Sequence, residues 1–422
     1  MHIAVITNEY PPHVYGGAGV HVAYLTRELA RLCGPEDRIS VLCFGDQDRT
    51  EGCLRIRGIG TDANLPAPDP GSAKVLATLC KNLIISGSLD QVDLVHCHTW
   101  YTHLAGCLMK TFSSAPLVLT THSLEPHRPW KADQLGPAYQ TSSWLERTAF
   151  QFADGVVAVS RAMREDVQHL YDVDPARIEI IHNGIDTEEY APKQDLDALT
   201  SLGIDPDMPY VLFVGRLTAQ KGVFHLLRAV PFLPAGTQVV LCAASPDNAD
   251  INADMEQAIA GLQHDPERRV LWIKQPVDKE RLIVLYSQAT VFVCPSVYEP
   301  FGIINLEAMA CATPVVASAV GGIPEIVLPE ENGFLVPLDP CSEANPEPRD
   351  PMAFAQNLAG YINRILDDPE LGRAMGDRAR RLVQERFSWT AIAEKTMGLY
   401  RRLQIHSGPS KAEASNGRSC ST

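Results

Sequence analysis

The sequence lacks any long apolar run. Although 45% of its 422 residues are hydrophobic, no stretch approaches the roughly 20 residues that a membrane-spanning helix needs. The N-terminus also lacks a basic region followed by an apolar one, because Met1 leads directly into His-Ile-Ala-Val-Ile-Thr, the pattern of a buried strand. We therefore expect neither a transmembrane helix nor a secretory signal.

Positive charge is in deficit, and paired cysteine motifs are missing. The 36 Lys and Arg are outnumbered by 51 Asp and Glu, and the net charge of −15 argues against nucleic acid or an anionic membrane as partner. Eleven cysteines occur without any Cys-x-x-Cys, and several lie in strand-like runs, namely Cys43, Cys97, Cys242 and Cys294. We interpret them as reduced core thiols, which favours a cytoplasmic protein.

What the sequence does contain is a regular alternation of short apolar runs and amphipathic stretches. Continuous Val, Ile and Leu runs indicate strands covered on both faces, as in parallel sheets with helical crossovers. The predicted strands are 2–7, 39–44, 93–97, 117–121, 156–159, 178–181, 210–214, 238–243, 270–274, 291–294, 314–317 and 334–336. The predicted helices include 20–32, 143–153, 221–230, 303–311 and 369–386.

Six predicted strands lie on each side of a polar segment, Asp186 to Pro209, that has no apolar run of its own. A chain of this length is too long for one ordinary core. We therefore predict an α/β protein with two doubly wound, Rossmann-like domains, 1–187 and 203–385, that face each other across a cleft. Ligands of such sheets bind beyond the carboxyl ends of the strands. The small, polar segment 407–422 is expected to be disordered.

The strongest clue to function is a pair of carboxylates, Glu299 and Glu307, on either side of Gly302. They follow the apolar run 291–294 and open a predicted helix. Carboxylates accept hydrogen bonds from hydroxyl groups, whereas the free N–H groups of a helix N-terminus attract phosphate. The combination suits a ligand that is part sugar and part phosphate.

Two basic residues follow the first strand of the second predicted domain. Arg216 and Lys221 lie after strand 210–214, at the same sheet edge as the two carboxylates, where two cations would neutralise a diphosphate. A solvated loop is the alternative. In the first domain, Gly17 and its neighbours either let the backbone approach a phosphate or form a plain turn. The sequence has no Gly-x-Gly-x-x-Gly, which disfavours a nicotinamide site.

Further polar candidates follow strands of the first domain. His122 comes directly after strand 117–121, where it either binds a sugar hydroxyl, relays a proton or has a structural role. Basic and hydroxyl residues in two loops suit a pocket for an anionic or sugar acceptor, with a solvated loop as the equal alternative. They are Arg128, Lys131, Ser160 and Arg161.

Metal-binding patterns are weak. His96 and His98 alternate at the end of a strand but have no third ligand nearby in the sequence. Aspartate pairs spaced by one residue occur mostly in turn-like sequence, at 172/174, 195/197 and 205/207, and such pairs usually form turns. The sequence therefore predicts no metal site.

Taken together, these motifs resemble the retaining glycosyltransferases of family 4, which have the GT-B fold. The resemblance runs from Met1 to about Leu403. Besides the motifs above it includes Glu9-Tyr10-Pro11-Pro12, Asn183-Gly184-Ile185-Asp186 and Thr313-Pro314-Val315-Val316-Ala317. The stretches 10–21 and 122–131 resemble in particular the actinobacterial-type glycogen synthases. That branch includes enzymes that make maltose 1-phosphate from ADP-glucose and glucose 1-phosphate.

The resemblance implies roles on the donor side. Arg216 and Lys221 would bind the donor diphosphate and stabilise the leaving nucleotide. Glu307 would hold the ribose, Glu299 the transferred glucose, and His122 that glucose near its reacting carbon. Backbone N–H groups would assist at Gly17, Gly302, Ile303 and Ile304.

On the acceptor side, the resemblance assigns Arg128, Lys131, Ser160 and Arg161. It also implies that a C-terminal helix, about 387–403, crosses back onto the first domain. Two positions depart from the family pattern. Ala243–Asp247 replaces a frequent Gly-x-Gly-Pro turn, which would change the wall of the donor pocket. Ala312 replaces a frequent glycine, and we expect this replacement to change only packing.

The implied reaction is retaining transfer of glucose from ADP-glucose to glucose 1-phosphate or a glucan chain end, in glycogen or starch biosynthesis, with no metal or other cofactor. One alternative is an enzyme that uses UDP-glucose or a lipid acceptor, although the sequence has no basic amphipathic helix to favour a lipid. Another is a nucleotide-sugar-binding protein without turnover. The sequence does not decide between ADP and UDP or between the two acceptors, and it leaves a homo-oligomer open.

Overall fold

The computed structural model of the chain describes residues 1–14, 16–62, 65–128, 132, 135–244, 249–265, 269–342 and 345–407. It divides into two compact units. One comprises Met1–His182 and the C-terminal segment from Trp389, and the other comprises Asn183–Ser388. Residues 183–187, predicted as the end of the first domain, and the linker 188–202 thus belong to the second unit. Most of the predicted disordered tail lies outside the described residues.

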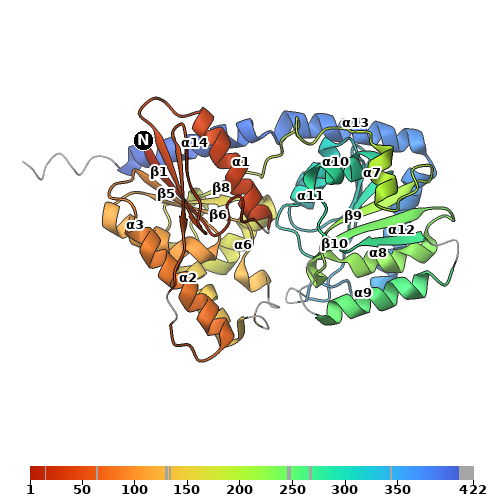
Figure 1. The fold of residues 1–422 in the computed structure, drawn as a ribbon, viewed down its shortest axis with the longest axis horizontal. Helices are drawn as coiled ribbons and strands as arrows, with labels where there is room; N and C mark the ends of the chain where they lie inside the picture. Colours follow the sequence, from red (N-terminus) through yellow and green to blue (C-terminus); the bar gives the residue numbers. More distant parts are fainter. Residues whose placement is uncertain are drawn as a thin grey trace, which may run out of the picture. The chain divides into compact units, whose positions relative to one another are not determined.

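The first unit is built on an eight-stranded sheet in the order β3-β4-β2-β1-β5-β6-β7-β8 (Figure 1). All neighbouring strands are parallel except β3 and β4. The strands are β1 (His2–Thr7), β2 (Arg38–Phe44), β3 (Asp48–Glu51), β4 (Leu54–Ile59), β5 (Leu94–His98), β6 (Leu117–Thr121), β7 (Gly155–Ala158) and β8 (Ile178–Ile180). Six of these lie where the sequence predicted strands.

The expectation of six strands in this domain is wrong, because β3 and β4 form a hairpin that the sequence did not reveal. β4 alternates buried and exposed residues, and all four residues of β3 are exposed. Such strands at the edge of a sheet do not need the continuous apolar runs by which the others were recognised.

Helices cover both faces of the first sheet. On one face, α1 (Gly17–Arg31) and α14 (Trp389–Ser407) share a buried cluster with β1 and β2 that includes Leu25, Leu29 and Tyr400. The remaining helices are α2 (Pro70–Ser86), α3 (His103–Ser113), α5 (Tyr139–Phe152) and α6 (Arg161–Tyr171). Short 3₁₀ turns are η1 (Trp100–Thr102), η2 (Glu125–His127), η3 (Gly136–Ala138) and η4 (Pro175–Arg177).

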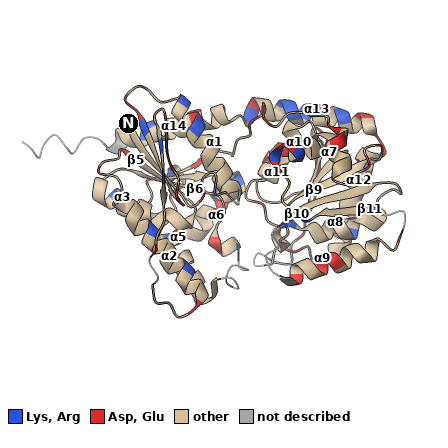
Figure 2. Cartoon of the chain, in the orientation of Figure 1, with Lys and Arg blue, Asp and Glu red and all other residues tan. Residues whose placement is uncertain are grey.

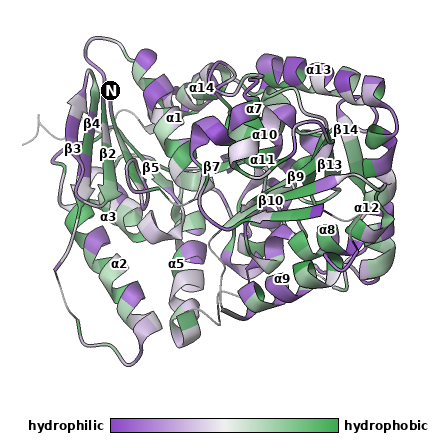
Figure 3. Cartoon of the chain, turned by 45° about the vertical axis from the view of Figure 1, so that its right-hand side comes forward, coloured by the Kyte–Doolittle hydropathy of each residue, from purple (hydrophilic) through white to green (hydrophobic). Residues whose placement is uncertain are grey.

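The second unit has a six-stranded sheet in the order β11-β10-β9-β12-β13-β14, with every neighbouring pair parallel. All six strands were predicted. They are β9 (Tyr210–Arg216), β10 (Gln238–Ala244), β11 (Arg269–Ile273), β12 (Val291–Cys294), β13 (Val315–Ser318) and β14 (Gly333–Val336). In Figure 3 the hydrophobic colour dominates β9 and β10, as expected of strands covered on both faces.

The helices of the second unit also lie on both faces of its sheet (Figure 1). They are α7 (Leu196–Ser201), α8 (Val223–Ala229), α9 (Ala249–Leu262), α10 (Lys279–Gln288), α11 (Ile303–Ala310), α12 (Pro351–Leu366) and α13 (Pro369–Arg386), with turns η5 (Ala219–Lys221), η6 (Val230–Phe232) and η7 (Ile323–Glu325). Local sequence sets the starts of α12 and α13. The side chains of Asp350 and Asp368 cap these helices by accepting hydrogen bonds from backbone N–H groups of the first turn. Each aspartate is followed by proline, which favours the first position of a helix.

The cysteines of the core lie as the sequence predicted, and the surface carries charged residues of both signs. Acidic and basic residues are interspersed on helices such as α13 (Figure 2). Cys43, Cys97, Cys242 and Cys294 are buried and free, which confirms that they are core thiols. Within the described residues, no helix combines the length and apolar character needed to cross a membrane.

Candidate functional site

The carboxyl edge of the second sheet carries the loops that hold most of the predicted donor residues. β9 is followed by η5 and then by Gly222, whose φ is +65°. A Cβ atom on Gly222 would lie 2.0 Å from the carbonyl oxygen of Pro295, so this loop approaches the loop after β12 only because the residue is glycine. The Val297 N–H donates to the Gln220 carbonyl at 3.0 Å and fastens the two loops.

This approach brings Lys221 and Glu299 into a buried ion pair. The Lys221 ammonium lies 2.6 Å from Glu299 Oε2, and their side chains are 15% and 9% exposed. The Ser296 hydroxyl also donates to Glu299 Oε2, at 3.3 Å. Burial acts to lower the pKa of Lys221, but the charge and hydrogen bond of Glu299 outweigh it and raise that pKa above its ordinary value. Lys221 is therefore a fixed cation.

Arg216 adds a second positive charge at this edge. It is the last residue of β9, and its side chain is exposed. No described residue forms an ion pair with it, yet its charge acts on the pKa of Lys221. An exposed guanidinium beside a buried ammonium is the arrangement expected of a site for a diphosphate.

The second carboxylate of the predicted pair, Glu307, is held by two tyrosines. The Tyr286 hydroxyl donates to Oε2 at 2.8 Å, and the Tyr190 hydroxyl donates to Oε1 at 3.4 Å. Burial raises the pKa of Glu307 to about 7, although the two hydroxyl groups act to lower it. Near neutral pH this carboxyl group is partly protonated, so it can both accept hydrogen bonds from hydroxyl groups and donate to them.

The N-terminus of α11 lies between these two carboxylates in the sequence. Gly302 precedes it with φ of +102°, and a Cβ atom there would lie 2.6 Å from the side-chain nitrogen Nδ2 of Asn305. Ile303 and Ile304 begin the helix, and the first N–H groups of a helix have no acceptor within it. These donors and the helix dipole favour an anion at the edge where Lys221 lies.

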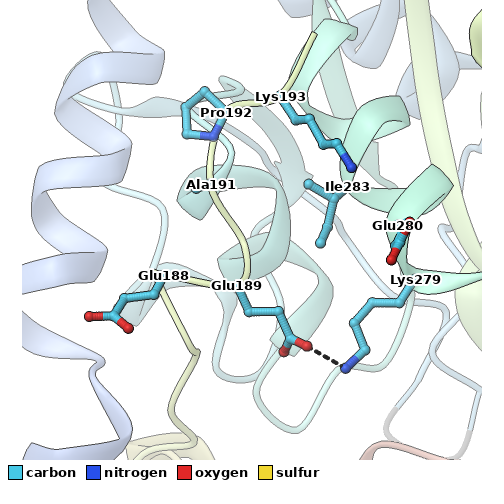
Figure 4. A pocket seen from close by; sticks show the side chains of 8 residues that line it. All are labelled: Glu188, Glu189, Ala191, Pro192, Lys193, Lys279, Glu280 and Ile283. Carbon is cyan, nitrogen blue, oxygen red and sulfur yellow. Dashed lines mark hydrogen bonds and ion pairs between the residues drawn. The ribbon is translucent and has the colours of Figure 1, made fainter. Parts of the chain in front are cut away.

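A shallow hollow on the second unit involves other residues. It has a volume of about 370 Å³, and its wall includes Glu188, Lys193 and the ion pair of Glu189 with Lys279 at 2.6 Å (Figure 4). None of the predicted site residues that the structure describes lines it. The paired side chains are substantially exposed, so the ion pair contributes little to stability. We assign this hollow no role.

In the first unit, the predicted glycine run lies against a buried carboxylate. Gly17 is the first residue of α1, and the Gly16 N–H donates to Glu9 Oε2 at 2.9 Å. A Cβ atom on Gly19 would lie 2.7 Å from Glu9 Cβ. The first turn of α1 can therefore approach Glu9 closely only because glycine stands there.

His122 follows β6 and belongs to a row of imidazoles. Its Nε2 lies 3.0 Å from His98 Nδ1. Next in the row, His96 bonds to the Tyr400 hydroxyl at 2.5 Å and to Thr120 Oγ1 at 2.7 Å. Burial lowers the pKa of His96 to about 3 and places those of His98 and His122 well below their ordinary value. His122 is therefore neutral near pH 7 and can bind a hydroxyl group without carrying charge.

Three imidazoles of this region also lie close enough for metal ligation. His21, His98 and His122 offer nitrogen atoms within 4.8 Å of one another, the one such group of three among the described residues. The sequence pattern pointed to His96 and His98 instead, since His21 is far away in the sequence. His98 and His122 bond to each other through Nδ1 and Nε2, whereas His98 Nε2 is buried without a hydrogen-bond partner among the described residues. The expectation that no metal is needed stays a prediction.

The residues predicted for the acceptor are not gathered around one cavity. Lys131 lies outside the described residues. Arg128 directs Nη1 to within 3.9 Å of Glu125 Oε1, a carboxylate that is 1% exposed. Ser160 is buried and caps α6 through its hydroxyl group, and Arg161 is exposed at the start of that helix. Their role in acceptor binding stays a prediction.

The side chains that hold Glu307 and His122 in place were not predicted from the sequence. Tyr190 and Tyr286 lie on segments far from Glu307 in the sequence, and no local motif marks them. His98 was detectable, because it ends the strand paired with the one that precedes His122. Two neighbouring parallel strands that both end in histidine predict contact between the two rings.

Comparison with known proteins covers nearly the whole chain. The family described as Glycosyltransferase Family 4 matches residues 15–189, and that described as Glycosyl transferases group 1 matches residues 197–382. The chain is 44% identical over 410 residues to an alpha-maltose-1-phosphate synthase of Mycolicibacterium smegmatis, with 96% of this chain and 100% of that protein covered. It is 28% identical over 422 residues to a glycogen synthase of Mycobacterium tuberculosis, with 95% and 94% covered.

A solved structure agrees with these sequence relatives. Sucrose-phosphate synthase from Thermosynechococcus elongatus superposes with a TM-score of 0.72 at 28% identity and covers 96% of this chain and 99% of its own. The predicted resemblance and the predicted class of two Rossmann-like domains are confirmed. The chain is a glycosyltransferase, and its similarity to maltose-1-phosphate synthase confirms the predicted class of hexosyltransferase.

Proposed function

Because the chain belongs to glycosyltransferase family 4, we propose that it transfers glucose from ADP-glucose to glucose 1-phosphate or a glucan chain end. The observation that carries the proposal is the buried pair of Lys221 and Glu299, with Arg216 beside it. The names of the synthase relatives support the choice of acceptors. We place the reaction in glycogen biosynthesis, in the cytoplasm.

The second unit supplies the donor site in this proposal. Lys221 and Arg216 stabilise the negative charge that grows on the diphosphate as its bond to glucose lengthens, helped by the first N–H groups of α11. Glu307 binds the ribose hydroxyl groups. Glu299 keeps Lys221 in place and accepts a hydrogen bond from the glucose.

The first unit supplies two further contacts. His122, neutral and held by His98, binds a hydroxyl group of the transferred glucose near its reacting carbon. The Gly17 N–H donates a hydrogen bond to a phosphate oxygen of the donor. Arg128, Ser160 and Arg161, with Lys131, remain candidates for contact with the acceptor.

We propose that the α configuration is retained. The bond between glucose C1 and the diphosphate oxygen breaks, and the acceptor hydroxyl oxygen bonds to C1 from the same face. The proton of that hydroxyl passes to the leaving phosphate oxygen, which gives ADP. No protein nucleophile, metal ion or other cofactor takes part in this scheme.

The test supplies the purified protein with ADP-glucose or UDP-glucose, and with glucose 1-phosphate or glycogen, in the absence of added metal. Nucleotide release and product masses are measured. We expect ADP-glucose to be consumed and a disaccharide phosphate or an elongated glucan to appear. Transfer only from UDP-glucose would contradict the proposed donor. Tight binding of ADP-glucose without transfer would instead indicate a nucleotide-sugar-binding protein.

A further inference from the structure

A cavity lies at the carboxyl edge of the first sheet, within the first unit. It has a volume of about 520 Å³, and its wall includes Asn8, Glu9, Phe44, Lys81 and Tyr101. Asn8 and Glu9 follow β1, Phe44 ends β2, Tyr101 follows β5, and Lys81 lies on α2. Parallel sheets bind ligands at this edge, and the volume is within the range of small-molecule sites. Of the residues predicted for the acceptor, the three that the structure describes, Arg128, Ser160 and Arg161, are not among those that line the cavity.

Lys81 provides a positive charge at the cavity wall. It is half-buried on α2, and its ammonium lies 4.7 Å from the centroid of the Phe44 ring. It ion-pairs with none of the residues that the structure describes. The contact with the ring positions the ammonium but leaves its N–H donors available. In a chain with a net charge of −15, an uncompensated lysine at a cavity wall favours an anionic ligand.

Glu9 and Asn8 provide acceptors for hydroxyl groups. Glu9 is 4% exposed, and its carboxylate accepts hydrogen bonds from the Gly16 N–H at 2.9 Å and from Asn8 Nδ2 at 3.4 Å. A carboxylate can accept several hydrogen bonds at once. Asn8 Oδ1 accepts a hydrogen bond from Thr99 Oγ1 at 2.7 Å. Thr99 has φ of +67°, a conformation that a β-branched residue rarely adopts. The loop after β5 is thus held in a strained form against the loop after β1, as is common at ligand sites.

Tyr101 provides a flat surface. Its ring stacks on that of Trp100, with centroids 4.2 Å apart and an angle of 25° between the planes. Its backbone carbonyl accepts a hydrogen bond from Asn82 Nδ2 at 2.7 Å. The ring is therefore fixed in orientation, and a fixed aromatic face suits the apolar face of a hexose.

We propose that this cavity binds a phosphorylated hexose, the acceptor of the reaction. Lys81 binds its phosphate, Glu9 and Asn8 bind its hydroxyl groups, and Tyr101 contacts its ring. The inference rests on the proposed glucosyl transfer and sharpens it, since it selects a sugar phosphate over a glucan chain end. Glu9 lines the cavity and also accepts a hydrogen bond from the Gly16 N–H. A hexose bound in the cavity therefore lies near Gly17, whose N–H is proposed to bind the donor phosphate.

The test is calorimetric titration of the full chain with glucose 1-phosphate in the absence of donor. Lys81→Ala removes a charge-assisted contact, so we expect its affinity to fall roughly tenfold to a hundredfold. Lys81→Arg keeps the charge and should keep most of the affinity. Lys74→Ala, at an exposed position of the same helix, should bind as the wild type does. ADP-glucose affinity should be unchanged in all three, which verifies that the variants are folded.

Three results would overturn the inference. One is wild-type protein that does not bind glucose 1-phosphate, even if it elongates glucan. Another is Lys81→Ala protein with affinity within about twofold of the wild type. The third is an equal loss of affinity for glucose 1-phosphate and for neutral maltotriose. If glucose 1-phosphate binds through Lys81 but no glucose is transferred from ADP-glucose, the assignment of the cavity holds and the proposed function fails.

Discussion

Lys221 combines a full positive charge with a side chain that is only 15% exposed. Burying an isolated ammonium is costly, but the carboxylate of Glu299, 2.6 Å away, compensates its charge. The pair thereby keeps the lysine protonated and in place before any ligand arrives. A charge that is already oriented stabilises a developing diphosphate anion without further rearrangement.

Replacement of Lys221 by alanine tests this role. Loss of one well-placed donor to developing charge costs about 3–4 kcal/mol, so Lys221→Ala should lower the turnover of ADP-glucose roughly a hundredfold to a thousandfold. The measurement is the initial rate of nucleotide release with saturating donor and acceptor.

Lys193→Ala, which removes an exposed lysine of the same unit, should retain wild-type turnover. Thermal melting of both variants separates lost activity from lost folding, because Lys221→Ala also leaves Glu299 uncompensated. A folded Lys221→Ala protein within a few-fold of wild-type turnover would exclude Lys221 from the chemistry.

The loops between strands and helices set where these side chains stand. Gly222 and Gly321 allow close approaches that a larger residue would prevent. A Cβ atom on Gly222 would lie 2.0 Å from the carbonyl oxygen of Pro295, and one on Gly321 would lie 1.9 Å from the backbone carbonyl oxygen of Glu299. Ala312, in the loop after α11, also has a left-handed conformation, with φ of +61°, but it is not glycine. We expected this replacement to change only packing, but the structure places Ala312 in a backbone conformation that favours glycine.

Ala312→Gly should therefore stabilise the protein. A left-handed conformation costs an L-residue about 1–2 kcal/mol, and the greater freedom of glycine in the unfolded chain offsets about 0.5–1 kcal/mol of that. We expect the free energy of unfolding, measured by urea denaturation, to rise by about 0.5–1 kcal/mol. Ala253→Gly, at an exposed helical position in α9, should instead lower it by about 1 kcal/mol. A similar decrease for Ala312→Gly would show that the left-handed backbone is not strained.

The elements differ in how far sequence alone predicts them. β1, β9 and β12 were predicted because strands buried on both faces are continuously apolar. β3 and β4 were missed because they do not form such runs. Individual site residues were recognised by their place after a strand. Their partners depend on which loops meet in three dimensions, so the contact of Lys221 with Glu299 was not predicted although both residues were singled out.

At the scale of the whole molecule, both units contribute polar groups at the carboxyl edge of a parallel sheet. The second unit carries the Lys221–Glu299 pair, and the first carries the imidazole row and the cavity beside Glu9. This division suits a reaction between two substrates, because the second unit holds most of the proposed donor contacts and the first holds the cavity proposed for the acceptor. The alignment with a synthase over 96% of this chain and 100% of that protein indicates that both units are kept together in these relatives.

The most direct test of the proposed reaction is proton NMR of ADP-glucose and glucose 1-phosphate incubated with the protein and followed in the reaction tube. Retaining transfer predicts that the anomeric signal of the donor gives way to that of a new α-1,4 linkage on a disaccharide phosphate, while ADP accumulates. A β-linked product, or donor that yields only free glucose and ADP, would contradict it.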